Sequence, residues 1–273
     1  MFKDKTIIIT GASSGLGKEL ARRLIYQGAH LALFARNKDK LIATKDELIS
    51  VAQENQKIEI FQCDVSDFNE TEKAVESLIH IMGSPDMLIN NAGIVSESYF
   101  ENLSVSTFRK IFDVNFFGTV NCIKCVLPHF KKKGRGRIVN IASLGGKIAS
   151  FGYSAYSSSK YAIVGLSDTL RMELKPQNIS VNLVCPGEFE SPMVDDLNTY
   201  RTRENLVITQ TVPVLPIDFV ADEIIAGILK ERYLIVPGKM ARLVELTSRW
   251  LPSGLRAVVD HKLKKVYQGP ART

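Results

Sequence analysis

Residues 143–160 read SLGGKIASFGYSAYSSSK and place three reactive side chains around the junction of a strand and a helix. Tyr156 and Lys160 are four residues apart, so a helix through them puts the phenol and the ammonium on one face. Ser143 directly follows the apolar run RIVNIA at 137–142, which is typical of a strand. The stretch therefore predicts that a strand end and a helix start bring a hydroxyl, a phenol and an ammonium together.

This cluster has the chemistry of a general acid–base. A free tyrosine titrates near pH ~10. A lysine charge about 4 Å away, at an effective dielectric near 20, favours the phenolate by roughly 4 kcal/mol, or about three pK units. We therefore expect the pKa of Tyr156 to lie near neutrality, where proton transfer is most effective, and Ser154 to cap the helix. Because a Tyr-x-x-x-Lys pair also occurs by chance, the alternative is a pair without a catalytic role.

Length and composition indicate one large globular α/β domain. The chain has 273 residues, of which 45% are hydrophobic and 23% charged. We see no apolar run that approaches the ~18 residues of a membrane span. A strand begins within a few residues of Met1, so we expect no signal peptide. These features predict a cytoplasmic protein, or one held peripherally at the cytoplasmic face of the membrane.

The net charge of +6 is concentrated at the C-terminal end. Residues 231–273 hold nine Lys or Arg and three Asp or Glu, while residues 1–230 hold 26 of each sign. The basic run at 131–137 falls between a helix end and a strand start, where it complements the helix dipole, so we expect no nucleic-acid partner. Cys122 and Cys125 form a CxxC without a second pair, and the four histidines are scattered, so we expect reduced core cysteines and no metal site.

Apolar runs and amphipathic stretches alternate along the chain. The strand-like runs are at 5–10, 31–35, 58–62, 87–90, 137–142, 179–185 and 233–236. The helical stretches are at 15–27, 38–52, 69–81, 106–132, 154–175 and 217–230. This alternation predicts a Rossmann-type, doubly wound parallel sheet of about seven strands. Ligands of such sheets bind beyond the carboxyl ends of the strands, where the strand order reverses.

A glycine motif, TGASSGLG at 10–17, follows the first strand and opens the first helix. Gly11 permits a tight turn, Gly15 lets the backbone approach a pyrophosphate, and Gly17 allows close packing of helix on sheet. The amides at the helix N-terminus then favour a bound phosphate. The motif predicts a dinucleotide site.

The end of the second strand indicates which dinucleotide is bound. An acid at this position suits the ribose 2′-hydroxyl of NAD, whereas an arginine suits the 2′-phosphate of NADP. The chain has no acid between residues 29 and 38, and Arg36 can bind phosphate in a bidentate manner, with Lys38 nearby. We therefore predict NADP(H) as the cofactor; the alternative is that Arg36 and Lys38 only begin a solvated helix.

Taken together, these motifs resemble the short-chain dehydrogenase/reductase family from about residue 5 to 237. The matching positions are TGASSGLG at 10–17, Asp64-Val65, NNAG at 90–93, Asn115, Ser143, the Tyr156–Lys160 pair and Pro186-Gly187. The resemblance implies that Tyr156 exchanges a proton with the substrate oxygen and that Ser143 positions this oxygen. It also implies that Lys160 binds the nicotinamide ribose, and that Asn115 holds a water that relays protons through Lys160.

The resemblance also implies the residues that contact the dinucleotide. Asp64 and Val65 would meet the adenine, and Ser191 stands where the family has threonine, next to the nicotinamide amide. The full set of expected cofactor contacts is Gly11, Ser13, Ser14, Gly15, Leu16, Gly17, Arg36, Lys38, Asp64, Val65, Asn91, Ala92, Gly93, Tyr156, Lys160, Pro186, Gly187 and Ser191.

Within the family, the chain is more closely similar to the 3-ketodihydrosphingosine (3-ketosphinganine) reductases. The similarity rests on MLINNAG at 87–93, GRIVNIAS at 136–143 and MELKP at 172–176. It implies an NADPH-dependent reductase of a lipophilic ketone. The alternatives are an NAD(P)-linked hydroxysteroid, oxoacyl or other secondary-alcohol dehydrogenase and, more remotely, a dinucleotide sensor without turnover.

Two further segments bear on the substrate. Residues 188–216 have little regular pattern but many apolar side chains, which predicts a lid over a lipophilic site or, alternatively, simple packing. We expect residues 1–238 to form the dinucleotide-binding and catalytic domain, and residues 239–273 a basic amphipathic helical extension. This extension would contact a membrane through residues 239–267, its own domain or a partner subunit. The resemblance also implies a homodimer or homotetramer formed through the helices at 106–132 and 154–175.

Overall fold

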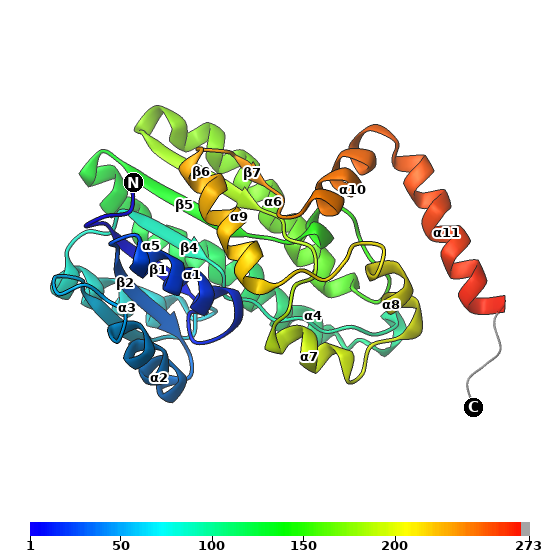
Figure 1. Cartoon of the computed structure of the whole chain (residues 1–273), viewed down its shortest axis with the longest axis horizontal. Helices are drawn as coiled ribbons and strands as arrows, with labels where there is room; N and C mark the ends of the chain where they lie inside the picture. Colours follow the sequence, from blue (N-terminus) through cyan, green and yellow to red (C-terminus); the bar gives the residue numbers. More distant parts are fainter. Residues whose placement is uncertain (269–273) are drawn as a thin grey trace.

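Seven strands form one parallel sheet in the order β3-β2-β1-β4-β5-β6-β7 in the computed structural model, which describes residues 1–268 (Figure 1). The strands are β1 Thr6–Thr10, β2 His30–Ala35, β3 Ile58–Gln62, β4 Met87–Asn90, β5 Gly136–Ile141, β6 Ile179–Val184 and β7 Leu234–Ile235. Consecutive strands run outward from β1 to β3, and the order then reverses at β4, which pairs with β1 on its other side. The predicted Rossmann-type sheet is confirmed, and its switch point lies between β1 and β4.

Helices cover both faces of this sheet and continue beyond it (Figure 1). The α-helices are α1 Gly15–Tyr26, α2 Lys38–Ile49, α3 Phe68–Met82, α4 Val105–Phe112, α5 Gly118–Lys133, α6 Ser154–Leu174, α7 Pro192–Asn198, α8 Arg203–Thr209, α9 Ile217–Leu229, α10 Lys239–Trp250 and α11 Pro252–Gln268. Short turns of other helix types are η1 Phe100–Asn102, η2 Asp113–Phe117, η3 Leu144–Gly146 and η4 Lys175–Gln177.

The alternation of side chains along β1 divides the core into two layers. Ile7 and Ile9 pack with α1, α2 and α9, whereas Ile8 packs on the other face with α3 and α5. A strand places successive side chains on opposite faces, and a sheet covered on both faces therefore needs a continuous apolar run such as TIIIT. The core fixes the sheet, and the carboxyl ends of its strands remain available for a site.

The predicted helix at 106–132 is interrupted. Its middle is the π-helical turn η2, with α4 before it and α5 after it. The side chain of Asn115, within the turn, bonds to the backbone of Ile94, and Thr119 Oγ1 donates to Asn115 O (2.8 Å). Side-chain bonds of this kind compete with the regular helical ladder, and π turns are frequent at functional sites.

This interrupted segment, Val105–Lys133, is long and apolar enough to cross a membrane by length and composition, contrary to our expectation of no such run. Of its most apolar window, 44% is buried inside the protein. Cys122, Val126 and Phe130 supply that burial against the sheet. A helix of the core of a globular protein has the same composition, and we assign the segment to the core.

Residues 188–216 are more regular than predicted, because they contain α7 and α8. Ser191 Oγ accepts from Val194 N (3.4 Å) at the start of α7, and Thr202 Oγ1 accepts from Asn205 N (3.3 Å) at the start of α8. Both helices are only seven residues long, too short to give a clear periodic signal in the sequence. The predicted cap of α6 was also wrong by one residue: its N-cap is Tyr153, and Ser154 begins the helix.

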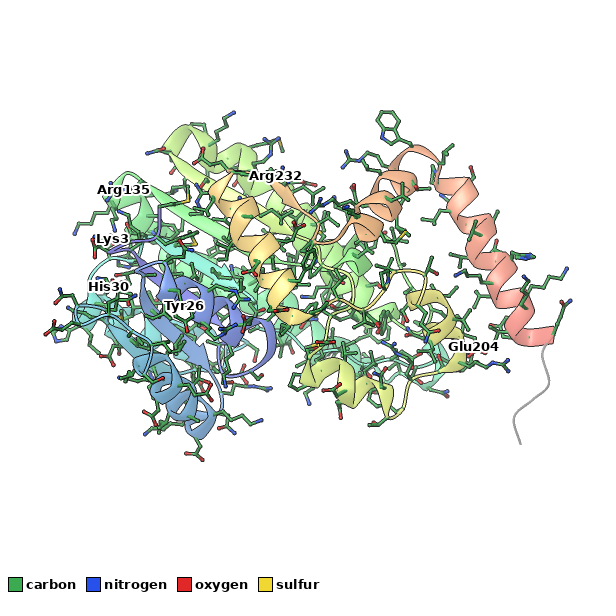
Figure 2. The ribbon with its side chains drawn as sticks, in the orientation of Figure 1. Lys3, Tyr26, His30, Arg135, Glu204 and Arg232 are labelled. Atoms are coloured by element: carbon green, nitrogen blue, oxygen red, sulfur yellow. The ribbon has the colours of Figure 1, made fainter. Side chains whose placement is uncertain are left out.

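The extension forms α10 and α11, which project from the end of the domain (Figure 1). The helix α11 contacts α8, and the labelled Glu204 of α8 lies close to it (Figure 2). Lys262 Nζ of α11 donates to Thr211 Oγ1 (2.7 Å). The extension thus packs on its own domain, one of the three arrangements we considered; residues 269–273 of the predicted extension lie outside the described residues.

Candidate active site

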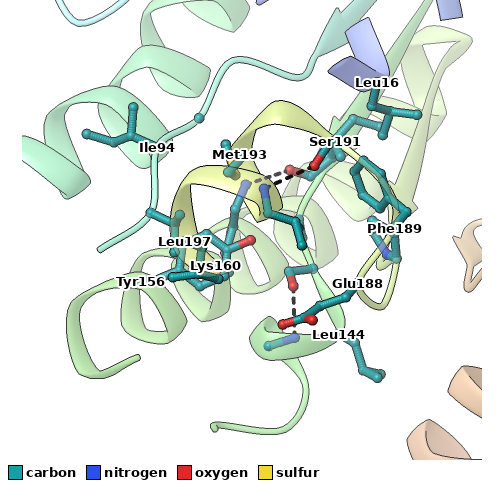
Figure 3. A pocket seen from close by; sticks show the side chains of 18 of the residues that line it. Leu16, Ile94, Leu144, Tyr156, Lys160, Glu188, Phe189, Ser191, Met193 and Leu197 are labelled. Carbon is teal, nitrogen blue, oxygen red and sulfur yellow. Dashed lines mark hydrogen bonds between the residues drawn. The ribbon is translucent and has the colours of Figure 1, made fainter. Parts of the chain in front are cut away.

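A cavity of about 800 Å³ opens where β1, β4, β5 and β6 end. Figure 3 shows Tyr156, Lys160, Glu188 and Leu197 around it, from α6, the loop after β6 and α7. The sequence-predicted residues that line it are Gly11, Ser13, Ser14, Gly15, Leu16, Arg36, Asp64, Val65, Asn91, Ala92, Gly93, Ser143, Tyr156, Lys160, Pro186, Gly187 and Ser191. Three predicted residues do not line it, namely Gly17, Lys38 and Asn115.

The glycine loop is shaped to admit a phosphate. Gly11 has a φ of +64°, and a Cβ there would lie 3.0 Å from Ala92 Cα; a Cβ on Gly17 would lie 2.4 Å from Gly11 O. Gly15, with a φ of +52°, is different, because its added Cβ would meet only Ser191 Cβ at 4.0 Å and would point into open space. The Ser14 side chain makes no capping bond to α1. Backbone amides, an unused hydroxyl and free space together fit a pyrophosphate at this helix N-terminus.

Hydrogen bonds from Asn91 fasten the glycine loop to the end of β4. Asn91 N donates to Thr10 Oγ1 (2.9 Å), and Asn91 Nδ2 donates to Thr10 O (3.0 Å). The resemblance implied that Asn91 lines the cofactor pocket, and the geometry adds that it ties the ends of β1 and β4 together at the switch point. Thr10 was the residue that sequence reasoning missed here.

Asn115 and Lys160 both lie close to Gly93. A Cβ on Gly93 would come within 3.3 Å of Asn115 Oδ1 and 3.5 Å of Lys160 Nζ. Asn115 Oδ1 accepts from Ile94 N (2.8 Å), and Asn115 Nδ2 donates to Ile94 O (3.0 Å) and to Ser159 Oγ (3.0 Å). The amide oxygen and the amide nitrogen of Asn115 both bond to protein groups, and the side chain is buried without lining the cavity.

The electrostatics of Tyr156 differ from our expectation. Lys160 Nζ lies 5.7 Å from the centre of the Tyr156 ring and donates to Ile141 O (3.0 Å). Burial raises the pKa of Tyr156, and a hydrogen bond with Ser143 partly offsets this rise. The loss of water around the phenol therefore dominates, and it raises the pKa where we expected the ammonium to lower it. Burial also lowers the pKa of Lys160 to about 8.

The basic side chains at the dinucleotide end of the cavity differ from the predicted pair. Arg36 lines it with 58% of its side chain exposed, and its Nη1 lies 3.8 Å from Asp64 Oδ2. Asn37 caps α2 by accepting from Lys40 N (2.8 Å), and Asn37 and Lys40 line the cavity where we expected Lys38. Lys40 lies in the first turn of α2, close in sequence to Arg36, and this proximity is the signal that could have identified it.

Sequence reasoning also missed a buried cluster of Tyr153, Glu188 and Arg201. Glu188 lines the cavity and forms an ion pair with Arg201, of which 4% of the side chain is exposed. Burial and the Glu188 charge raise the pKa of Tyr153. Glu188 and Arg201 are thirteen residues apart in a segment without a clear periodic pattern, so no local signal in the sequence indicated their pairing.

Cysteines and metal ligands add no further chemistry. All four cysteines are free, and Cys63, Cys122 and Cys185 are buried. Within residues 1–268 no group of three or more His, Cys, Asp or Glu side chains could hold a metal ion.

Comparisons with known proteins agree with this geometry. A model of the short chain dehydrogenase family matches residues 5–202. A 3-ketodihydrosphingosine reductase of Mus musculus is 34% identical over 229 residues, which cover 83% of this chain and 69% of the relative. One of Bos taurus is 36% identical over 221 residues, which cover 80% of this chain and 67% of the relative. The chain thus spans about two thirds of the length of these relatives.

Solved structures show the same fold. Levodione reductase aligns with a TM-score of 0.80 and 27% identity over 89% of this chain and 98% of its own. The L-sorbose reductase of Gluconobacter frateurii, solved with NADPH and L-sorbose, aligns with a TM-score of 0.77 over 88% of this chain and 97% of its own. At 22% identity, the second likeness concerns the fold alone.

The buried ammonium of Lys160 should make stability depend on pH. The pKa of Lys160 is about 8 in the folded chain, against an ordinary value of 10.5. Burial of the charged side chain therefore lowers the free energy of unfolding below pH 8. Between these two values the unfolded chain holds the extra proton, so wild-type stability rises with pH. Relative to Lys160→Met, we expect a gain of up to roughly 3 kcal/mol from pH 7 to 10.5, measured by urea unfolding. A difference between the two proteins that stays constant over this range would contradict the burial of a charged Lys160.

Proposed function

The chain belongs to the short-chain dehydrogenase family, whose members are oxidoreductases that bind a nicotinamide dinucleotide, and we propose that it uses NADPH to reduce a lipophilic ketone of the 3-ketosphinganine type. The observation that carries this proposal is the placement of Tyr156 between Ser143 and Lys160 at the wall of a largely apolar cavity. A phenol beside a hydroxyl and an ammonium can pass a proton to a carbonyl oxygen, and such transfer is worth about 10²–10⁴-fold in rate.

The residues at the wall have separate roles in this reduction. NADPH would lie from the glycine loop to Ser191 and would supply the reducing equivalents. Ser143 would donate a hydrogen bond to the substrate carbonyl and orient it, and the Tyr156 hydroxyl would donate the proton. The Lys160 ammonium would stabilise the phenolate that remains, because at pH 7 a lysine with a pKa of about 8 is still mostly charged.

The preference for NADPH is supported by the charges at the far end of the cavity. Arg36 and Lys40 line it there, and both can bind a 2′-phosphate. Asp64, 3.8 Å from Arg36, is the competing charge, and it could instead accept from a ribose hydroxyl. We propose that the two basic side chains outweigh it.

The apolar side chains of the wall opposite the dinucleotide end support a lipophilic substrate. Apolar side chains of α7, α8, α11 and the neighbouring loops supply it: Phe189, Met193, Val194, Leu197, Ile208, Val212, Leu255, Val258 and Val259. Residues 188–216 thus face the cavity as a lid would, and α11 completes the wall. A polar sugar substrate would leave this surface without partners.

The second candidate within the enzymes is a hydroxysteroid, oxoacyl or other secondary-alcohol dehydrogenase that runs in the oxidative direction, and the same proton relay would serve it. A sensor without turnover is disfavoured, because a protein that only binds a dinucleotide has no need of a phenol placed with a hydroxyl and an ammonium for proton transfer.

We also propose that the outer face of the extension meets a lipid surface at the cytoplasmic face of a membrane. Trp250 is 76% exposed and Leu251 65%, and Leu243 and Leu246 are about half exposed. Residues 239–268 carry seven Lys or Arg and two Asp or Glu. Exposed apolar side chains within a basic segment favour an anionic bilayer, at about 1 kcal/mol per basic residue.

Replacing Tyr156 with Phe should abolish the reaction. With a panel of long-chain ketones, steroid ketones and polar ketones, we expect wild-type oxidation of NADPH to be fastest with the long-chain ketones. Tyr156→Phe should lower kcat by about 10²–10⁴-fold, because the proton donor is lost. Tyr161→Phe, on the exposed side of the same helix, is the control and should retain activity. Undiminished activity of Tyr156→Phe would refute the proton-donor role.

Replacing Arg36 with Leu should change the cofactor preference. We expect the wild type to bind NADP⁺ more tightly than NAD⁺ by calorimetry. Arg36→Leu should weaken NADP⁺ binding about 10–100-fold, since a charge-assisted bond to phosphate is lost, and should leave NAD⁺ binding nearly unchanged. Lys38→Leu is the matched control. Tighter binding of NAD⁺ by the wild type would overturn the assignment of Arg36.

The lipid contact can be followed through Trp250, the single tryptophan of the chain. Vesicles that contain phosphatidylglycerol should shift its fluorescence to shorter wavelength and carry the protein into the pellet, and salt should weaken both effects. Leu243→Glu with Leu251→Glu should abolish them, whereas Leu229→Glu on α9 should not. Absence of both signals with the wild type would rule out a lipid contact through this face of the extension.

A further inference from the structure

One carboxylate stands in the wall of the cavity near Tyr156. Glu188, in the loop after β6, lines the cavity with 17% of its side chain exposed (Figure 3). Among the described lining residues the only other acid is Asp64, which lies beside Arg36 at the dinucleotide end. Burying a carboxylate is costly unless it is paired, so Glu188 needs both a partner and a reason to be there.

Its partner is Arg201, between α7 and α8. Arg201 Nη2 donates to Glu188 Oε1 (2.5 Å) and Arg201 Nη1 to Glu188 Oε2 (3.1 Å). The Tyr153 hydroxyl lies 3.4 Å from Glu188 Oε1 and 3.3 Å from Arg201 Nη2. Because Glu188 lines the cavity and Arg201 does not, the pair presents its negative end to the ligand space. Each carboxylate oxygen can accept more than one hydrogen bond, so acceptor capacity remains.

A role in holding residues 188–216 over the cavity does not by itself explain the Glu188–Arg201 ion pair. Thr202 already ties the lid to Glu97, through its backbone N (3.0 Å) and its Oγ1 (2.6 Å), and Asn205 Nδ2 donates to Phe151 O (2.5 Å). A buried ion pair is a weak source of stability, and apolar residues of similar volume often serve as well. The position of the charge, rather than its contribution to stability, is the feature to explain.

The carboxylate lies one aromatic ring away from the reacting position. The Tyr153 ring packs edge-on against the Tyr156 ring at 5.3 Å between centres, and Tyr153 contacts Glu188. A ketone oxygen at Tyr156 would therefore bring the groups on the adjacent carbon toward Glu188. Leu144, Phe189 and Leu197 line the same part of the cavity, and Lys262 of α11, which donates to Thr211 Oγ1, is the basic side chain in the lining from the substrate half.

Building on the proposed function, we propose that Glu188, held by Arg201 and Tyr153, is the residue that binds the ammonium group next to the carbonyl of a 3-ketosphinganine-type substrate. The alkyl chain would then lie along α7, α8 and α11. An ammonium donates three hydrogen bonds. Its attraction to the protein is strongest at Glu188, the negative end of the buried pair. Glu188 is thus the residue that determines specificity, and Tyr156 keeps its role in proton transfer.

The kinetic test uses two ketones of one chain length, 2-aminododecan-3-one and dodecan-3-one, with NADPH. We expect wild-type kcat/KM to favour the amino ketone by about tenfold or more, as for a hydrogen bond to a charged group. Glu188→Gln should bring this ratio close to one and change kcat/KM for dodecan-3-one by only a few-fold. Glu190→Gln, an exposed acid two residues away, is the matched control and should keep the wild-type ratio. A ratio unchanged by Glu188→Gln would overturn the inference.

A second variant covers the possibility that Glu188→Gln leaves Arg201 unpaired and unfolds the chain. Glu188→Leu with Arg201→Met removes both charges together, a replacement that buried pairs often tolerate. It should lose the amino preference in the same way while thermal unfolding stays cooperative. Retention of the preference in this folded double variant would equally overturn the inference.

Binding without turnover separates this inference from the proposed reaction. On the NADP⁺-bound protein, 1-decylamine should bind about tenfold more tightly than 1-decanol by calorimetry, below their micelle concentrations, and only while Glu188 is present. Equal binding of amine and alcohol would overturn the ammonium site. Selective amine binding by a protein that reduces none of the ketones would instead refute the proposed reaction and leave the ammonium site standing.

Discussion

The burial of one ammonium group organises this molecule. Lys160 is 4% exposed, and its Nζ donates to Ile141 O at the end of β5. A charge taken out of water must be held by nearby dipoles, so the surrounding chain has to come very close. Gly93 leaves room beside Nζ, and a Cβ on Gly146 would lie 2.7 Å from Lys160 O. The ends of β4 and β5, the turn η3 and the helix α6 therefore meet closely around this one residue.

The cavity next to this lysine is built from two sources. The dinucleotide half comes from the ends of β1 and β4, where Asn91 and Thr10 hold the strands around the glycine loop. The opposite half comes from α7, α8 and α11, which follow the sheet in the chain and are not part of its core. In the proposed reaction, the half built on the sheet would carry the proton-transfer groups, and the half formed by α7, α8 and α11 would select the substrate.

Charge within the cavity follows the same division. Arg36, Lys40 and Asp64 stand at the dinucleotide end, Lys160 stands at the centre, and Glu188 and Lys262 belong to the substrate half. Glu188 and Lys160 are largely removed from water, and both are held by hydrogen bonds to protein groups. In a low-dielectric wall such fixed charges act strongly on a ligand, since no water has to reorganise around them.

The sequence by itself determined the sheet, the order of its elements and most of the lining of the cavity, because these follow from local periodicity and from motifs at strand ends. The tertiary structure alone decided the rest. The π turn at Asn115 depends on Ile94, twenty-one residues earlier in the chain, and the pairing of Glu188 with Arg201 depends on how the lid folds back. The rise in the pKa of Tyr156 likewise depends on how much water the folded wall of the cavity excludes. Each of these features depends on contacts between distant segments or on burial. Contacts and burial of this kind cannot be read from a local pattern of residues.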